Sequence, residues 1–443
     1  MIRDTDAKGT SMSERKAIPV DAKLPAPQAC ALGLQHFLSM FGATVLVPLL
    51  MGFSPSVSVM CSGLGTIIYL LCTKQRIPSY LGPSFSFIGP IVAASAVCGP
   101  SGVGSGIVAA GLVFAVIAFV IWRVGTRWID ALVPPPVMAA IIIVIGCGLA
   151  ATAVSEAFLD GAGNPRPWQE ITVAFVALLV VVACTCFGKR LLGTIPVLAG
   201  AAVAYALACV FGLVDFSAVA QAPWFGLPEF TFPSFDLGAI ALVAPIALVV
   251  VIEHIGHLFV IGQMTGVDYG PILHRSILGD GLATVAAGFL GAPPATTFAE
   301  NIGVMSVTRV YATQIFWYAA GAALVVGGFC PKLGALVGTI PDPVIGGVSI
   351  IIFGLIACNG LKMLVENGID LSDNRTVTVV CAPIVVGVGM QALGAGIPIG
   401  DYSLPGLAAA ALLGITLNLV LPKGAIKNAD PQPTRASKAR FLR

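Results

Sequence analysis

Long apolar runs, separated by short polar interruptions, follow one another from Ala29 to Leu421. A helix of about 20 apolar residues crosses the hydrocarbon core of a bilayer. The spacing of the runs therefore predicts a polytopic all-α membrane protein with no soluble domain between its spans. About fourteen runs have this character, and they cover residues 29–51, 56–73, 79–98, 103–122, 132–153, 170–187, 191–214, 237–264, 277–293, 297–309, 311–330, 343–361, 376–398 and 403–421.

The composition agrees with this pattern. Hydrophobic residues make up 57% of the 443 residues and charged residues only 10%, whereas soluble globular domains carry about 25% charged residues. Residues 1–28 and 422–443 are polar and are expected to be two solvated tails.

The eleven cysteines lie mostly inside apolar runs, without a Cys-x-x-Cys pair or a Cys/His cluster. We expect them to be reduced and structural, and we expect no metal.

Basic residues are concentrated in every second loop between the predicted spans, and such a bias orients membrane proteins. If the N-terminus is cytoplasmic, ten Lys and Arg residues fall in cytoplasmic loops and only Arg166 and Lys332 fall in loops on the opposite side. The ten are Lys74, Arg76, Arg123, Arg127, Lys189, Arg190, Arg275, Arg309, Lys362 and Arg375. The pattern predicts a multi-pass protein of the cytoplasmic (inner) membrane with both termini cytoplasmic.

Two segments indicate an internal repeat. Val133-Pro-Pro-Pro-Val matches Ile340-Pro-Asp-Pro-Val, so Pro134 corresponds to Pro341, and 341 minus 134 gives an offset of 207 residues. An offset of seven spans, an odd number, inverts the second copy in the membrane. Inverted repeats are a common plan of secondary transporters and place the substrate near the bilayer midplane. The alternative is that prolines at helix starts simply resemble one another.

Two predicted spans are broken by Gly and Pro at equivalent places, the third at 80–90 and the tenth at 291–303. Ser84-Phe-Ser-Phe87 alternates polar and apolar residues, which favours an extended strand. Extended backbone at membrane depth needs hydrogen-bond partners from protein, a cavity or a ligand. We therefore expect two short facing strands beside a binding site. The alternative is a pair of loops packed between helices without a ligand.

Few ionisable residues lie inside the predicted spans. The eighth span carries Glu253, His254 and His257, and the tenth carries Glu300. The i to i+4 spacing places Glu253 and His257 on one helical face. Because burial favours the neutral form of a carboxyl group, Glu253 and Glu300 are suited to exchange a proton near neutral pH. The alternatives are structural roles, such as a bond between Glu253 and His257.

Two further groups stay outside this hypothesis. His36 in the first span is expected to be a buried polar residue with a partner, and Asp280 is expected to be interfacial, without an assigned role. No Gly-x-x-x-x-Gly-Lys-Ser/Thr motif occurs. We therefore expect no cofactor, and an ion gradient rather than ATP as the energy source.

Four segments resemble the nucleobase-ascorbate transporter family, and in particular its bacterial uracil permeases. They are Gln35–Pro48, Tyr80–Pro90, Glu253–His257 and Thr297–Val304. The resemblance covers residues 28–421 and implies fourteen segments in two inverted repeats of seven, with short strands in segments 3 and 10. It also implies a core domain of residues 29–130 and 237–330 and a gate domain of residues 131–236 and 331–421.

The resemblance also implies the roles of the site residues. Glu253 and Glu300 would hydrogen-bond a nucleobase, Phe85 would pack near it, Ala299 would offer its backbone N–H, and His257 would take part in proton coupling. Phe298 is also expected to contact the substrate, and Phe298 and Ala299 stand where the uracil permeases often have Tyr and Gly.

The same resemblance points to the substrate. Relatives that carry xanthine or uric acid usually have Gln-Asn-x-Gly where this chain has Glu300-Asn-Ile-Gly303, which favours a pyrimidine. The implied activity is import of uracil by proton symport in a lipid bilayer, with a homodimer as a further family expectation and no nucleic-acid partner.

Three alternatives stay open. They are a xanthine or uric acid symporter, an anion transporter of the same architecture, and a membrane-embedded enzyme. Paired carboxylates would repel an anion, and no nucleophile elbow or nucleotide loop supports an enzyme.

Overall fold

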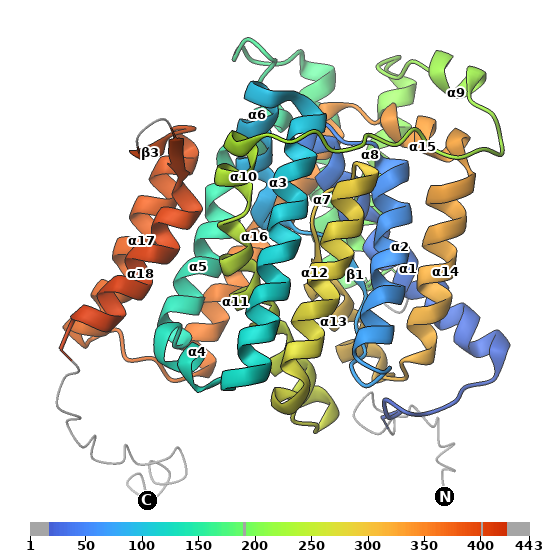
Figure 1. Cartoon of the computed structure of the whole chain (residues 1–443). Helices are drawn as coiled ribbons and strands as arrows, with labels where there is room; N and C mark the ends of the chain where they lie inside the picture. The colour runs from blue at the N-terminus through green and yellow to red at the C-terminus, as the bar shows by residue number, and fades with distance from the viewer. Residues whose placement is uncertain (1–16, 189–191, 400–401, 423–443) are drawn as a thin grey trace, which may run out of the picture.

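The computed structural model describes residues 17–188, 192–399 and 402–422, and consists of long helices lying side by side (Figure 1). Most of the two predicted tails, together with Lys189 and Arg190, lie outside the described residues. The elements are α1 (Ala26–Met51), α2 (Pro55–Cys72), β1 (Leu81–Pro83), η2 (Phe85–Phe87), α3 (Ile88–Val124), α4 (Arg127–Leu132), α5 (Pro135–Gly148), α6 (Ala150–Phe158), α7 (Trp168–Phe187), α8 (Pro196–Val210), α9 (Ser217–Gln221), α10 (Leu237–Val243), α11 (Ile246–Thr265), η3 (Gly270–Ile272), α12 (Leu273–Leu290), β2 (Ala295–Thr297), α13 (Ala299–Thr308), α14 (Gln314–Phe329), α15 (Pro331–Gly338), α16 (Asp342–Glu366), α17 (Asn374–Ala392), β3 (Gly396–Ile399), β4 (Tyr402–Pro405) and α18 (Gly406–Val420).

Eight helical stretches in the described part of the chain are long and apolar enough to cross a membrane, or nine if α14 and α15, bent by 82°, form one span. The polytopic all-α fold class is therefore confirmed, while the count of fourteen spans stays a prediction. The later part of predicted span three continues into span four as one helical stretch, α3, which is kinked at Gly99. Gly99 has φ 69°, a left-handed conformation that favours glycine, and Pro100 follows it.

Helices α5 and α16, which contain the repeated sequence, begin after Pro134 and Pro341 in extended conformations. They pack closely because glycines line the contact: Gly146 lies against the backbone of Phe353 and Ala357, and Gly360 lies against that of Ala139. Later residues of α5 thus meet earlier residues of α16, so the two helices run antiparallel. This is the relationship that an inverted repeat requires.

The two broken spans meet, as the sequence predicts. β1 and β2 pair antiparallel, with Leu81 opposite Thr297, Gly82 opposite Thr296 and Pro83 opposite Ala295. α12 packs against β2, and α2 packs against β1. The short ladder therefore lies among helices, where its outer backbone groups can find partners.

The predicted extended conformation of Ser84–Phe87 is wrong, because Phe85–Phe87 forms a 3₁₀ turn. The N–H of Ser84 donates to the carbonyl of Pro294 at 2.9 Å, which is the last bond of the ladder. Pro294 and Pro293 lack the N–H groups that would extend the pairing. The chain turns instead, and the N–H of Phe87 donates to the carbonyl of Ser84.

Candidate functional site

Glu253 lies on α11 beside the turn that follows β1. The hydroxyl of Ser86 in η2 donates a hydrogen bond to Oε2 of Glu253 at 3.1 Å. Ser86 is buried, whereas Glu253 is half-buried. The turn that follows β1 therefore holds the carboxyl group of Glu253 from one side.

Ala299 and Glu300 form the first turn of α13, directly after β2. Both are half-buried, in contrast to the fully buried residues of β2. The first turn of a helix has free backbone N–H groups and partial positive charge. Glu300 and the N–H of Ala299 can thus present an acceptor and a donor side by side.

The two aromatic residues predicted for the site have different surroundings. Phe85 packs edge-to-face on Phe353 of α16, with ring centroids 5.9 Å apart. Phe298 is almost fully buried, and its ring covers Gly82 so closely that a Cβ at Gly82 would collide with two ring atoms. Its N–H donates to the carbonyl of Tyr80. Phe298 therefore packs against the β1 strand, a contact that the sequence did not reveal.

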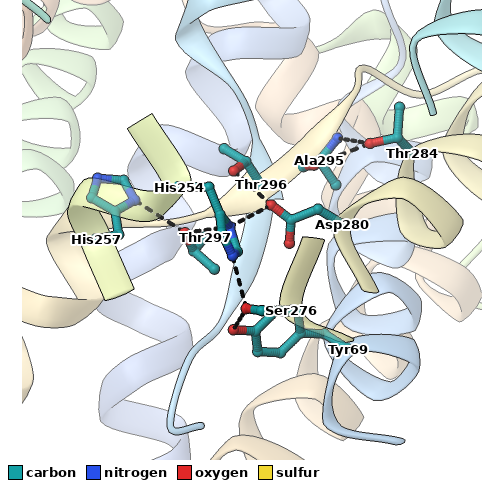
Figure 2. A network of polar contacts seen from close by, with 9 residues as sticks. All are labelled: Tyr69, His254, His257, Ser276, Asp280, Thr284, Ala295, Thr296 and Thr297. Atoms are coloured by element: carbon teal, nitrogen blue, oxygen red, sulfur yellow. Dashed lines mark hydrogen bonds and ion pairs between the residues drawn. The ribbon is translucent and has the colours of Figure 1, made fainter. Parts of the chain in front are cut away.

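His257 is hydrogen-bonded to the second strand (Figure 2). Its Nδ1 lies 3.0 Å from Oγ1 of Thr297, and the same hydroxyl lies 3.4 Å from Nδ1 of His254. Glu253 and His257 share one face of α11, as the sequence predicts. Their hydrogen bonds nevertheless go to Ser86 and Thr297, and together these bonds link α11 to both broken spans.

A fully buried polar cluster contacts β2 (Figure 2). Nδ1 of His254 lies 2.8 Å from Oδ2 of Asp280, and the hydroxyl of Thr296 donates to the same oxygen at 2.9 Å. Nε2 of His254 lies 2.7 Å from the hydroxyl of Ser276, which lies 2.6 Å from that of Tyr69. The cluster thus joins α2, α11, α12 and β2.

The interfacial position expected for Asp280 is wrong, because Asp280 is completely buried. A signal for this was present in the sequence: Ser276, Asp280 and Thr284 follow one another at intervals of four and form a polar stripe along α12. Thr284 completes the stripe by bonding both the carbonyl and the N–H of Ala295. An intramembrane polar stripe of this kind indicates a buried partner.

His36 connects α1 to the same region. Its Nδ1 lies 2.5 Å from Oδ1 of Asn301, the residue after Glu300, and both side chains are buried. The expectation of a buried, partnered histidine is confirmed. Within residues 17–188, 192–399 and 402–422, no group of three or more His, Cys, Asp or Glu side chains could hold a metal ion.

Comparison with known proteins decides the family. The sequence profile described as "Permease family" matches residues 27–395. The chain belongs to this permease family. The permease is 44% identical to a protein named uracil permease from Bacillus caldolyticus, over 89% of this chain and 92% of that one. It is 42% identical to the uracil permease of Bacillus subtilis, over 95% and 98%, and 40% identical to a putative pyrimidine permease of Escherichia coli, over 96% of each.

Solved structures show the same fold at low sequence identity. The transmembrane domain of a cyanobacterial bicarbonate transporter matches with a TM-score of 0.64 and 14% identity, over 85% of this chain and 99% of that one. The anion transporter SLC26A9 of the mouse matches with a TM-score of 0.65 and 12% identity, over 90% and 68%. Its membership of the permease family, together with its apolar helices, makes this chain an integral membrane transporter, not an enzyme.

Proposed function

We propose that this permease imports uracil, or a close pyrimidine analogue, together with a proton. The observation that carries the proposal is that the paired strands bring two acids to one region: Glu253 accepts a hydrogen bond from Ser86 in the turn after β1, and Glu300 lies in the first turn of the helix after β2. The names of the two Bacillus relatives support uracil as the substrate.

The chemistry of the two carboxyl groups suits a nucleobase. Uracil presents ring N–H donors and carbonyl acceptors on neighbouring edges. A carboxylate only accepts hydrogen bonds, whereas a neutral carboxyl group both donates and accepts. Two nearby carboxylates also repel each other, and protonation of one removes this electrostatic repulsion. A proton taken up at Glu253 or Glu300 would therefore change which edges of the base can be bound.

The remaining contacts would fix the base in the site. Phe85 would pack against its ring, and the N–H of Ala299 would donate to a carbonyl. His257 would assist the proton step, and Phe298 would support the pocket from behind by holding β1. Coupling then follows if proton and base stabilise the same conformation of the transporter. The proton gradient would supply the energy, without a cofactor.

The proposal includes an arrangement in the inner membrane. Both termini would be cytoplasmic, and a core domain (29–130 and 237–330) would move against a gate domain (131–236 and 331–421), which could also mediate a homodimer. The loops after α2 and α3 lie at the same end of the bundle as the start of α1 and the end of α18 (Figure 1). This agrees with the positive-inside pattern of the sequence.

Uptake of labelled uracil into proteoliposomes tests the proposal. We expect an inward proton gradient to accelerate uptake and unlabelled uracil to compete better than xanthine. Glu253→Gln and Glu300→Gln should abolish transport, whereas Glu366→Gln should not, because Glu366 is an exposed residue paired with Lys362 on α16. Uptake that ignores the gradient would contradict proton coupling, and preference for xanthine would contradict the pyrimidine assignment.

A further inference from the structure

We propose that a cavity at one end of the bundle binds the phosphate headgroup of an anionic phospholipid. The cavity has a volume of about 630 Å³ and is lined by side chains from three segments, residues 21–23, 74–75 and 313–318. None of its lining residues belongs to the candidate transport site. The proposal is therefore independent of uracil transport and of proton coupling.

Each wall of the cavity lies at the end of an apolar helix. Residues 21–23 lead into α1, residues 74–75 follow α2, and residues 313–318 form the start of α14. By length and composition α1 and α2 can each cross a membrane, and α14 can do so together with α15. The three segments lie at the same end of the bundle (Figure 1). Because spanning helices extend across the hydrocarbon core, their ends place the cavity at the level of the lipid headgroups.

The first wall, residues 21–23, is held in place by hydrogen bonds on both sides of it. On one side, the N–H of Thr313 donates to the carbonyl of Val20 at 3.0 Å. On the other side, the N–H of Leu24 donates to Oε1 of Gln314 at 2.8 Å, and Nε2 of Gln314 donates to the carbonyl of Leu24 at 3.2 Å. The start of α14 thus fixes the backbone of the first wall.

The second wall is a turn that positions Lys74. Lys74 and Gln75 both have left-handed backbone conformations, with φ 53° and 56°, which are uncommon for residues other than glycine. Their N–H groups donate to the carbonyls of Leu71 and Leu70, at 3.1 and 2.8 Å, and hold the turn against the end of α2. Both lysines of the cavity are therefore carried by hydrogen-bonded backbone.

The charged side chains that line the cavity favour an anion. Lys23 and Lys74 are exposed, and among the described residues neither ammonium group has an ion pair or a hydrogen bond. Asp21 also lines the cavity, so that two positive charges stand against one negative charge. Lysine is a common partner of phosphate, whose oxygens accept its hydrogen bonds. The cavity thus offers unused donors and a net positive charge to a phosphate group.

The surroundings favour a phospholipid over a soluble phosphate. Leu71, about one turn of α2 before Lys74, is 61% exposed, so an apolar surface continues from the cavity toward the hydrocarbon core. Trp317 and Tyr318 also line the cavity, and such aromatic residues are enriched at the level of the headgroups. A phospholipid fits both parts, with its phosphate at the lysines and an acyl chain along α2. Basic pockets between membrane helices bind anionic headgroups in this way.

Fluorescence quenching at Trp317 tests the site in the purified full-length protein. The chain has five tryptophans, and subtracting the signal of a Trp317→Phe variant in each background isolates Trp317. We expect brominated phosphatidylglycerol to quench this signal at a lower concentration than brominated phosphatidylcholine. Lys23→Gln and Lys74→Gln should each raise the half-quenching concentration of phosphatidylglycerol about fivefold, the effect of one lysine near an anionic lipid.

Further variants and a soluble competitor separate this site from general effects. Asp21→Asn should lower the half-quenching concentration, a gain that loss of folding could not produce. Lys362→Gln should leave it unchanged, since Lys362 is an exposed lysine paired with Glu366 on α16, outside the cavity. Native mass spectrometry with both lipids makes the same comparison without a tryptophan substitution. Equal binding of the two lipids, or unchanged binding in Lys23→Gln and Lys74→Gln, would overturn the proposal. Displacement of phosphatidylglycerol by equimolar inorganic phosphate would also overturn it, because the site would then belong to a soluble phosphate.

Discussion

Ser86 and Glu300 occupy equivalent positions in the two halves of the permease. Each lies three residues after the end of its strand, which is Pro83 in β1 and Thr297 in β2. The offset is 214 residues, both from Leu81 to Ala295 and from Ser86 to Glu300. One repeat thus contributes a hydroxyl that bonds Glu253, and the other contributes a second acid. The site is therefore asymmetric although the scaffold is repeated.

The Ser86 hydroxyl should matter for substrate binding. Ser86→Ala removes the donor to Glu253, and a hydrogen bond of this kind contributes about 1 kcal/mol. We therefore expect uracil affinity to fall about fivefold, measured by equilibrium binding to the purified protein. Ser84→Ala is the matched control, since the buried Ser84 hydroxyl has no hydrogen-bond partner among the described residues. Equal effects of the two substitutions would rule out a specific role for Ser86.

Gly82 should tolerate no side chain. A methyl group there would collide with the Phe298 ring, and overpacking of this kind costs about 1–3 kcal/mol. We expect Gly82→Ala to lower the thermal unfolding temperature in detergent and Phe298→Leu to restore part of it in the double variant. Gly89→Ala should leave the unfolding temperature unchanged, because no atom lies within 4 Å of a Cβ at Gly89. A stable Gly82→Ala single variant would mean that the strands are less tightly packed.

His36 and Asn301 should contribute to stability as a coupled pair. Each side chain is buried with the other as its partner, so removing one leaves a polar group unpaired at a cost of about 1–3 kcal/mol. We expect Asn301→Ala and His36→Ala each to destabilise the protein and to reduce transport by displacing the turn that carries Glu300. The double variant should lose less stability than the two single losses combined. Additive losses, measured by thermal unfolding, would show that the contact is energetically unimportant.

Asp373 should give a pH-dependent contribution to stability outside the membrane. Its carboxylate accepts hydrogen bonds from the side chain and the N–H of Thr376 at the start of α17, which hold its pKa below the usual value. The stabilisation is therefore complete above the unfolded pKa of about 3.9 and is lost as the pH falls through the lower folded value. We expect Asp373→Asn to be slightly less stable than the wild type at pH 7. The difference should shrink below about pH 4, as followed by thermal unfolding; a constant difference would contradict this assignment.

The features that the sequence predicted correctly are local ones. Apolar runs of sufficient length identify helices because the bilayer excludes unpaired backbone groups, and Gly and Pro mark where those helices break. The two breaks at 80–90 and 291–303, their pairing as strands and the shared face of Glu253 and His257 could all be recognised in this way. The burial of Asp280 was not predicted, although the polar stripe at intervals of four on α12 was a signal for it.

Only the tertiary structure shows which groups these residues contact. Ser84–Phe87 alternates like a strand, but Pro293 and Pro294, which precede the opposite strand, end the ladder, and the segment turns. Glu253 bonds Ser86, 167 positions away, and His257 bonds Thr297, 40 positions away. The sequence by itself determined which groups are costly to bury in a membrane. Only the folded chain decided which donors and acceptors satisfy them, because those partners come from other helices and strands.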